Sequence, residues 1–180
     1  THEAPASFPH FSEEGLWLLT SMMLRDGAGN VLSLSATDLA TLSISATVDV
    51  LGAGDILPPV VTAVSVSPQA VDTSAAAHAV VVTYAATDDV SGVAYSTGYV
   101  SGVVFTSPSG GQTVKVNAAS FSLASGTAQD GTHEASASFP HFSEEGLGLL
   151  TSMMLRDGAG NVLSLSATDL ATLSISATVD

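Results

Sequence analysis

Short runs in which apolar and polar residues alternate fill most of this chain. His78–Thr87 (HAVVVTYAAT) and Val60–Ser67 (VVTAVSVS) are the clearest of these runs. A period of two, bounded by Gly, Pro, Asp and Asn, is typical of β-strands. No segment keeps a helical apolar period, so we predict an all-β fold. The same pattern predicts further strands at residues 92–106 with an interruption at Ser96–Gly98, and at Thr113–Leu123, Thr132–Phe139, Leu147–Arg156, Val162–Ser166 and Ser174–Val179.

Clusters of turn-forming residues separate the predicted strands. Pro68–Ala77, SPSGG at 107–111 and Gly126–Gly131 are predicted turns, and ATDLATL at 167–173 predicts a single helical turn. The DGAGN sequence at Asp157–Asn161 predicts a tight hairpin turn, because its glycines can adopt positive φ angles. About seven to nine short strands at this spacing predict an antiparallel, immunoglobulin-like β-sandwich.

The first 49 residues recur almost unchanged at residues 132–180. Two positions differ: Pro5 corresponds to Ser136, and Trp17 corresponds to Gly148. The copies are 131 residues apart, a length that suits one self-contained domain per repeat. Near-identical tandem domains are typical of stalks, fibres and multivalent binders, and an enzyme rarely needs them.

This repeat predicts the domain organisation. We expect residues 1–49 to be the C-terminal half of one repeat and residues 50–180 to be a complete repeat. The GAGDILPP sequence at Gly52–Pro59 indicates a linker at about residues 50–58. Residues 1–49 lack the partners of a complete sandwich, so we expect a preceding segment or strands of a neighbouring identical chain to complete them.

The charge balance limits the partners of this chain. Three Lys and Arg residues stand against 17 Asp and Glu residues, which gives a net charge of −14. Nucleic acids and anionic membrane surfaces would repel such a chain, so we expect neither as a partner, whereas a divalent cation suits it. No stretch of the sequence is long and apolar enough to span a bilayer.

Patterns that indicate catalysis are absent from the sequence. No GxSxG nucleophile motif occurs, and His10, His78 and His141 lack the HxH or HExxH spacing of zinc ligands. We therefore predict no catalytic residues and no enzyme activity.

Several short motifs occur in one order along the repeat: DILPP at 55–59, VSVSP, ATDDVSGV, FTSPSG, SGTAQDGT, EEGLW at 13–17, and LRDGAGN. Their order resembles the tandem Ig-like or cadherin-like repeats of giant bacterial surface adhesins and secreted exoproteins. The resemblance covers the whole 131-residue unit. It implies β-sandwiches strung in tandem outside the cell or on the bacterial surface, often with calcium at the domain junctions.

One position departs from this pattern. Where the family tends to place an aromatic residue after EEGL, this chain has Trp17 in one copy and Gly148 in the other. A core tryptophan replaced by glycine would leave a cavity that costs about 3–5 kcal/mol. We therefore expect this position to lie at the surface.

Acidic residues mark one end of the predicted sandwich. Because strand directions alternate, the start of the first strand and two of the turns meet at that end. These places hold Asp55, the Asp88–Asp89 pair, and Asp157 with Asn161. A hard cation that takes about six to eight oxygen ligands would relieve the repulsion between the carboxylates, and Ca²⁺ suits flexible loop ligands. The resemblance makes Asp55, Asp88 and Asp89 the strongest candidates; alternatively, these residues simply form turns.

The partial repeat carries matching residues. Asp26 and Asn30 occupy the turn that corresponds to Asp157–Asn161, and their partners would lie before residue 1. We therefore expect that calcium site to be incomplete in this chain. Glu13 and Glu14 lie on a loop at the opposite end of the preceding domain, where they could complete a junction site.

The repeat, together with this resemblance, predicts a structural extender of an extracellular bacterial adhesin or surface fibre, whose repeats contact one another and are stiffened by calcium. Neighbouring identical chains are possible partners, because the edge strands lack the charged residues that usually prevent pairing. The alternative is a carbohydrate-binding module, repeated for avidity, with Tyr84, Tyr95 and Tyr99 on a face that binds surface glycans.

Overall fold

The computed structural model describes residues 5–95, 101–174 and 178–179, and the chain divides into two compact units. Unit 1 is Thr1–Gly54 and unit 2 is Asp55–Asp180, so the division falls within the predicted linker. Antiparallel strands dominate both units, which confirms the all-β prediction.

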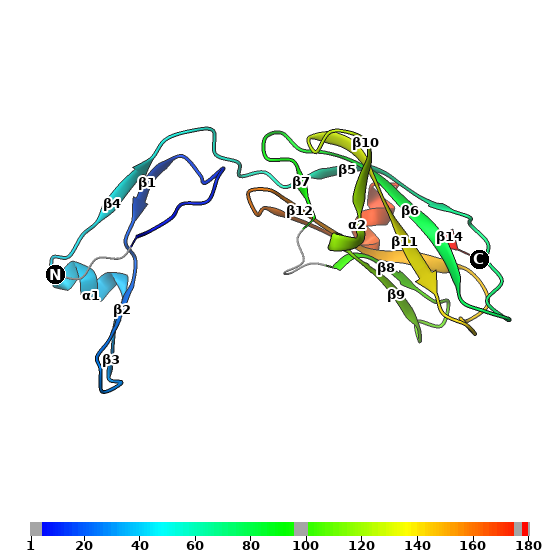
Figure 1. The fold of residues 1–180 in the computed structure, drawn as a ribbon, viewed down its shortest axis with the longest axis horizontal. Helices are drawn as coiled ribbons and strands as arrows, with labels where there is room; N and C mark the ends of the chain where they lie inside the picture. Colours follow the sequence, from blue (N-terminus) through cyan, green and yellow to red (C-terminus); the bar gives the residue numbers. More distant parts are fainter. Residues whose placement is uncertain (1–4, 96–100, 175–177, 180) are drawn as a thin grey trace. The chain divides into compact units, whose positions relative to one another are not determined.

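Unit 2 contains two antiparallel sheets (Figure 1). The first sheet has the order β10-β11-β6-β5, and the second has the order β13-β12-β8-β9, with β7 and β14 also paired to β12. The strands are β5 (Val60–Ser67), β6 (His78–Thr87), β7 (Val93–Ala94), β8 (Ser101–Thr106), β9 (Thr113–Asn117), β10 (Ser122–Gly126), β11 (Asp130–Phe139), β12 (Gly148–Asp157), β13 (Val162–Ser166) and β14 (Thr178–Val179).

The alternating pattern decides which side chains enter the core. In β6, Val80, Val82, Tyr84 and Ala86 are buried, while the residues between them are more exposed. Side chains of one strand face opposite sides of a sheet in turn, so every second residue of β6 points inward. The β11 strand pairs with β6 along all ten residues and fixes this register.

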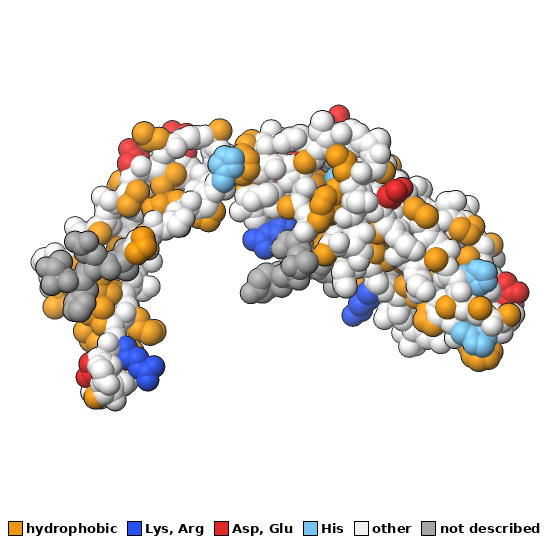
Figure 2. All heavy atoms as spheres, in the orientation of Figure 1, with side chains coloured by type: hydrophobic (Ala, Val, Ile, Leu, Met, Phe, Trp, Pro, Cys, Tyr) orange, Lys and Arg blue, Asp and Glu red, His pale blue; other side chains and the backbone are white. Residues whose placement is uncertain are grey.

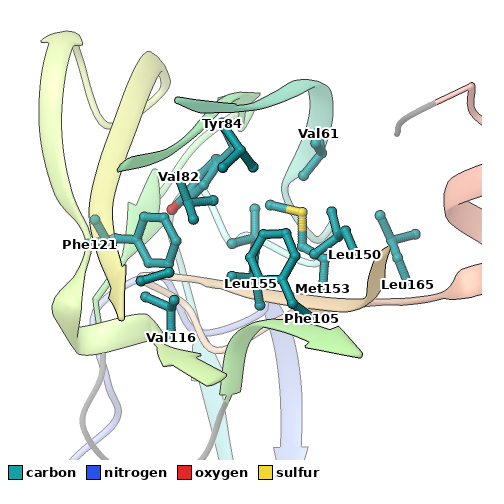
Figure 3. Packing of buried hydrophobic residues seen from close by; sticks show 14 of the residues in the cluster. Val61, Val82, Tyr84, Phe105, Val116, Phe121, Leu150, Met153, Leu155 and Leu165 are labelled. Carbon is teal, nitrogen blue, oxygen red and sulfur yellow. The ribbon is translucent and has the colours of Figure 1, made fainter. Parts of the chain in front are cut away.

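The two sheets share one hydrophobic core. Figure 3 shows Val82 and Tyr84 of β6 facing Phe105 of β8 and Met153 and Leu155 of β12. These five side chains are at most 3% exposed. Each large side chain that leaves water in this way stabilises the fold by about 1.5–3 kcal/mol.

One predicted strand is divided in the structure. Thr113–Leu123 was expected to be continuous, but β9 ends at Asn117 and a 3-10 turn, η1 (Ala118–Ser120), follows. The chain crosses there from the second sheet to the first, and Phe121 enters the core at 4% exposure. A single strand could not pair with β8 and then with β11, which lie in different sheets.

The predicted helical turn forms in both copies, as α1 (Ala36–Thr41) and α2 (Ala167–Thr172). Each helix has a capping box, in which Ser35 or Ser166 exchanges hydrogen bonds with the Asp three residues later. This reciprocal pairing satisfies backbone donors that a helix start leaves free.

Unit 1 has much of the local structure of residues 132–180, but the matching side chains are not buried. It contains β1 (Gly15–Leu18), which pairs with β4 (Thr47–Val50), and β2 (Met22–Arg25), which pairs with β3 (Val31–Leu34). Residues 5–9 are not in a strand, although the copy of residues 5–8, residues 136–139, lies within β11.

The core side chains of unit 1 are correspondingly exposed. Leu24 is 53% exposed in unit 1, whereas its counterpart Leu155 is 3% exposed in unit 2. Likewise, Leu19 is 39% exposed and Leu150 only 7%. Figure 2 shows hydrophobic side chains spread over the surface of unit 1. Identical residues therefore differ in burial because of what packs against them.

Gly148 corrects the expectation of a surface position. It is buried at the start of β12, and Leu150, two residues further on the same face, is in the core. The residue that corresponds to Trp17 therefore lies on the inner face of a complete unit. Because glycine has no side chain, the space that a tryptophan ring would fill at this position stays open.

These paired positions give a matched test of the fold. We expect Leu155→Ala to lower the free energy of unfolding of unit 2 by about 2–5 kcal/mol, because it leaves a cavity in the core. Leu24→Ala, the same change in the same local sequence, should alter stability by no more than about 0.5 kcal/mol. Urea unfolding followed by circular dichroism measures both values. Equal losses would contradict the difference in packing.

Candidate functional site

Three acidic residues meet at one end of unit 2. Asp55 precedes β5, and Asp88 and Asp89 directly follow β6. One carboxylate oxygen from each residue lies within 4.8 Å of the others. Asp55 and Asp88 are only 5% and 9% exposed, whereas Asp89 is open to solvent. We call these three residues the acidic cluster.

Two backbone amides, one local and one from the turn after β6, hold the Asp55 carboxylate. Its Oδ2 accepts a hydrogen bond from the Ser91 amide at 2.9 Å, and its Oδ1 accepts one from the Leu57 amide at 3.2 Å. The Asn161 side-chain amide donates to Asp55 Oδ1 at 3.3 Å and to the Asp55 carbonyl at 3.1 Å. The start of β5 is thus fixed to the two turns that follow β6 and β12.

Asp88 carries a buried carboxylate oxygen that lacks a hydrogen bond from the described residues. Its Oδ1 accepts bonds from the amides of Gly92 at 2.5 Å and Val90 at 3.3 Å, whereas no residue that the structure describes donates to its buried Oδ2. Gly92 has a φ of +79°, and a Cβ atom there would lie 2.7 Å from the Cβ of Ala128. Glycine is therefore required for the turn that places this amide.

Burial raises the pKa of the Asp88 carboxyl above its ordinary value of 3.8. The Gly92 and Val90 hydrogen bonds oppose this rise, and the nearby Asp55 and Asp157 carboxylates add to it. A buried carboxylate with an unpaired oxygen is costly unless a proton or a cation neutralises it. Neutralisation of Asp88 would therefore remove an electrostatic cost from the folded state.

Asp157 and Asn161 organise the turn after β12. Asp157 Oδ1 accepts bonds from the amides of Gly160 at 2.5 Å and Asn161 at 2.8 Å, and its Oδ2 accepts one from Asn161 Nδ2 at 2.7 Å. In unit 1, Asp26 and Asn30 make the two corresponding bonds at 2.8 and 2.7 Å. The turn therefore forms from its own hydrogen bonds, without the acidic cluster.

These contacts separate the predicted ligands into groups. The structure brings Asp55, Asp88 and Asp89 together and places Asp157 and Asn161 beside them. Asn161 donates hydrogen bonds from its amide nitrogen to the carboxylates of Asp55 and Asp157, and these bonds position Asp55. This contact joins two residues that are 106 positions apart in the sequence, so it depends on the tertiary fold.

The remaining predicted ligands belong to unit 1. Asp26 and Asn30 make only their local turn there, as described above. Glu13 and Glu14 lie on an exposed loop beside Gly54, where an added Cβ would come within 2.8 Å of the Glu13 Cα. Their part in a junction site stays a prediction.

One of the three tyrosines expected on a glycan-binding face is buried. Tyr84 is 2% exposed and stacks on the buried His133 at 4.7 Å, so it belongs to the core. Tyr95 is partly exposed, and its hydroxyl lies 2.5 Å from Nδ1 of His133. Tyr99 lies outside the described residues. No sequence pattern pointed to His133, whose ring lies between those of Tyr84 and Tyr95.

Comparison with protein-family models, with curated proteins and with solved structures finds no match for this chain. Among the described residues, no helix combines the length and apolar character that a bilayer crossing requires.

The raised pKa of Asp88 predicts how stability depends on pH in the presence of chelator. Because the folded pKa exceeds the unfolded one, its contribution is fully present below pH 3.8 and is lost as the pH rises through the folded value. We expect Asp88→Asn to keep the Gly92 hydrogen bond and to raise the Tm at neutral pH.

The matched control is Asp72→Asn. The pKa of Asp72 is lowered by its hydrogen bonds from Ser74, so its contribution to stability is lost as the pH falls. Thermal melts across about pH 3 to 7 should therefore change in opposite directions for the two variants. A native-like pH profile for Asp88→Asn would show that ionisation of Asp88 does not limit stability.

Proposed function

We propose that this chain is a structural extender built from tandem immunoglobulin-like β-sandwiches, part of an extracellular bacterial adhesin or surface fibre. The observation that carries the proposal is the recurrence of residues 1–49 at residues 132–180, with the core side chains covered in one copy and exposed in the other. A module that is repeated nearly unchanged extends the length of the protein, a role that needs no catalytic residues.

The strand order supports the immunoglobulin-like assignment. If β5, β6, β10 and β11 correspond to strands A, B, D and E, the first sheet reads D-E-B-A. If β8, β12 and β13 correspond to strands C, F and G, the second sheet reads G-F-C, with β9 as an added neighbour of β8. The shared core lies between these sheets, as it does in a sandwich.

Unit 1 then represents the second half of a preceding repeat. Its apolar face needs the strands that residues 50–131 supply in unit 2, namely β5 to β10 and the beginning of β11. A preceding copy of this segment would cover Leu19 and Leu24 as it covers Leu150 and Leu155 in unit 2. In an array of such repeats, the first half of each repeat covers the apolar face of its second half.

Calcium has a mechanical role in this proposal. Asp55 is the first residue of unit 2, and the other members of the acidic cluster belong to the turn after β6. A cation bound by Asp55, Asp88 and Asp89 would tie the point where the chain enters the unit to the body of the fold. The linker would lose freedom, and the array would stiffen.

The calcium proposal predicts a shift in thermal stability. Ca²⁺ at about 100 times its Kd should stabilise unit 2 by about 2.7 kcal/mol, and chelator should reverse the effect. Asp89→Asn separates calcium binding from folding best, because this exposed carboxylate can be neutralised without disturbing the core. It should leave the Tm in chelator unchanged and lose most of the calcium response. Asp72→Asn should retain the response, and an unaltered response in Asp89→Asn would exclude this cluster.

The array proposal predicts a change in fluorescence. Trp17, the one tryptophan of the chain, is 42% exposed in unit 1. When residues 50–131 are added in front of Thr1, we expect this ring to become buried and its emission to shift to shorter wavelength. The chain of 180 residues is the control. If the emission maximum stays the same, residues 50–131 do not complete unit 1.

A further inference from the structure

The Trp17/Gly148 difference coincides with a pocket of about 1010 Å³ in unit 2. The pocket lies where β6 begins and β12 starts, at the end of β6 away from Asp88. Phe105 and Phe139 line it and are 1% and 8% exposed, and Gly148 forms part of its wall. The rest of the lining mixes apolar residues with polar and charged ones, so the pocket offers both packing surface and hydrogen-bonding groups to a ligand.

Position 148 has the same backbone setting as position 17. Gly148 in β12 pairs with Val179, and Trp17 in β1 pairs with the corresponding residue, Val48. The preceding loop also keeps its form, because Phe142 and Phe11 have φ angles of 63° and 65°. The space beside Gly148 therefore corresponds to the place of an indole ring in the other copy.

Unit 1 shows what an indole contacts in this setting. The Trp17 ring meets the Phe8 ring edge-on, with centroids 5.4 Å apart and planes at 85°. Its Nε1 donates a hydrogen bond to the Glu13 carbonyl at 2.9 Å. Unit 2 has the same two residues, Phe139 at the end of β11 and Glu144 in the following loop, and both line the pocket.

Hydrogen bonds hold the loop of this pocket in place. Glu144 accepts bonds from the Ser109 amide at 3.0 Å and the Ser109 hydroxyl at 2.6 Å, and its own amide donates to Gln112 Oε1 at 2.8 Å. His141 Nε2 lies 2.9 Å from the Ser74 carbonyl. A site that is already ordered loses less entropy when it binds a ligand.

We propose that unit 2 binds a planar aromatic molecule of the indole class in this pocket. The ring occupies the space that Gly148 leaves, packs against the edge of Phe139, and donates its N–H to the Glu144 carbonyl. A repeat with tryptophan at this position fills the space with its own side chain. The Trp/Gly difference would then distinguish ligand-binding repeats from purely structural ones.

Titration of the full chain with indole, followed by calorimetry and thermal melts, tests this proposal. We expect saturable binding and a rise in the Tm of unit 2. Gly148→Trp should abolish this binding, because the new side chain occupies the pocket. Leu149→Trp is the matched control: it adds the same ring at a neighbouring position that is 48% exposed, and binding should persist.

Two further measurements keep the test independent of the Gly148→Trp variant, which could fail to fold. Indole methylated at nitrogen should bind about fivefold more weakly, because it loses one hydrogen bond. Phe139→Leu should also weaken binding, because it removes the aromatic edge. Absence of saturable indole binding, or equal binding by Gly148→Trp and the native chain, would overturn the proposal.

Discussion

Burial of the apolar faces between two sheets is the interaction on which the rest of this structure depends. Unit 2 has both sheets, and there β12 runs unbroken for ten residues with Met153 and Leu155 in the core. The same sequence in unit 1 gives two separate four-residue strands, and Leu24 lies open to solvent. Local sequence therefore sets the turns and the helix cap, and tertiary packing extends the strands.

The same packing produces the two chemical features of unit 2. Strand ends that meet at one edge bring Asp55 to Asp88 and Asp89 and bury a carboxylate oxygen that has no partner. At the other end of β6, the glycine at position 148 leaves a pocket where the other copy has a tryptophan. We propose a cation for the first feature and a flat aromatic ring for the second. Both lie at ends of the sheets, where side chains can differ without disturbing the central core.

The sequence predicted those parts of the fold that depend on local pattern. β5, β6 and β13 begin and end at the predicted residues, because alternating runs end there at turn-forming residues. The break between β9 and β10 was missed, since Phe121 continues the apolar pattern although the chain changes sheet. The meeting of Asp55 with Asp88 and Asp89 followed from strand order, but the unpaired oxygen of Asp88 and the donor role of Asn161 did not. The unpaired oxygen and the donor role both depend on distances between residues that are far apart in the sequence.

Amide hydrogen exchange in the native chain of 180 residues tests the central claim most directly, because both copies are present in one sample. The account predicts slow exchange for the amides of Met153–Leu155 and fast exchange for the identical amides of Met22–Leu24. Adding residues 50–131 before Thr1 should then slow the second set to the rate of the first. Equal protection of the two sets in the native chain would contradict the account, because the second half of the repeat would then be stable without the first.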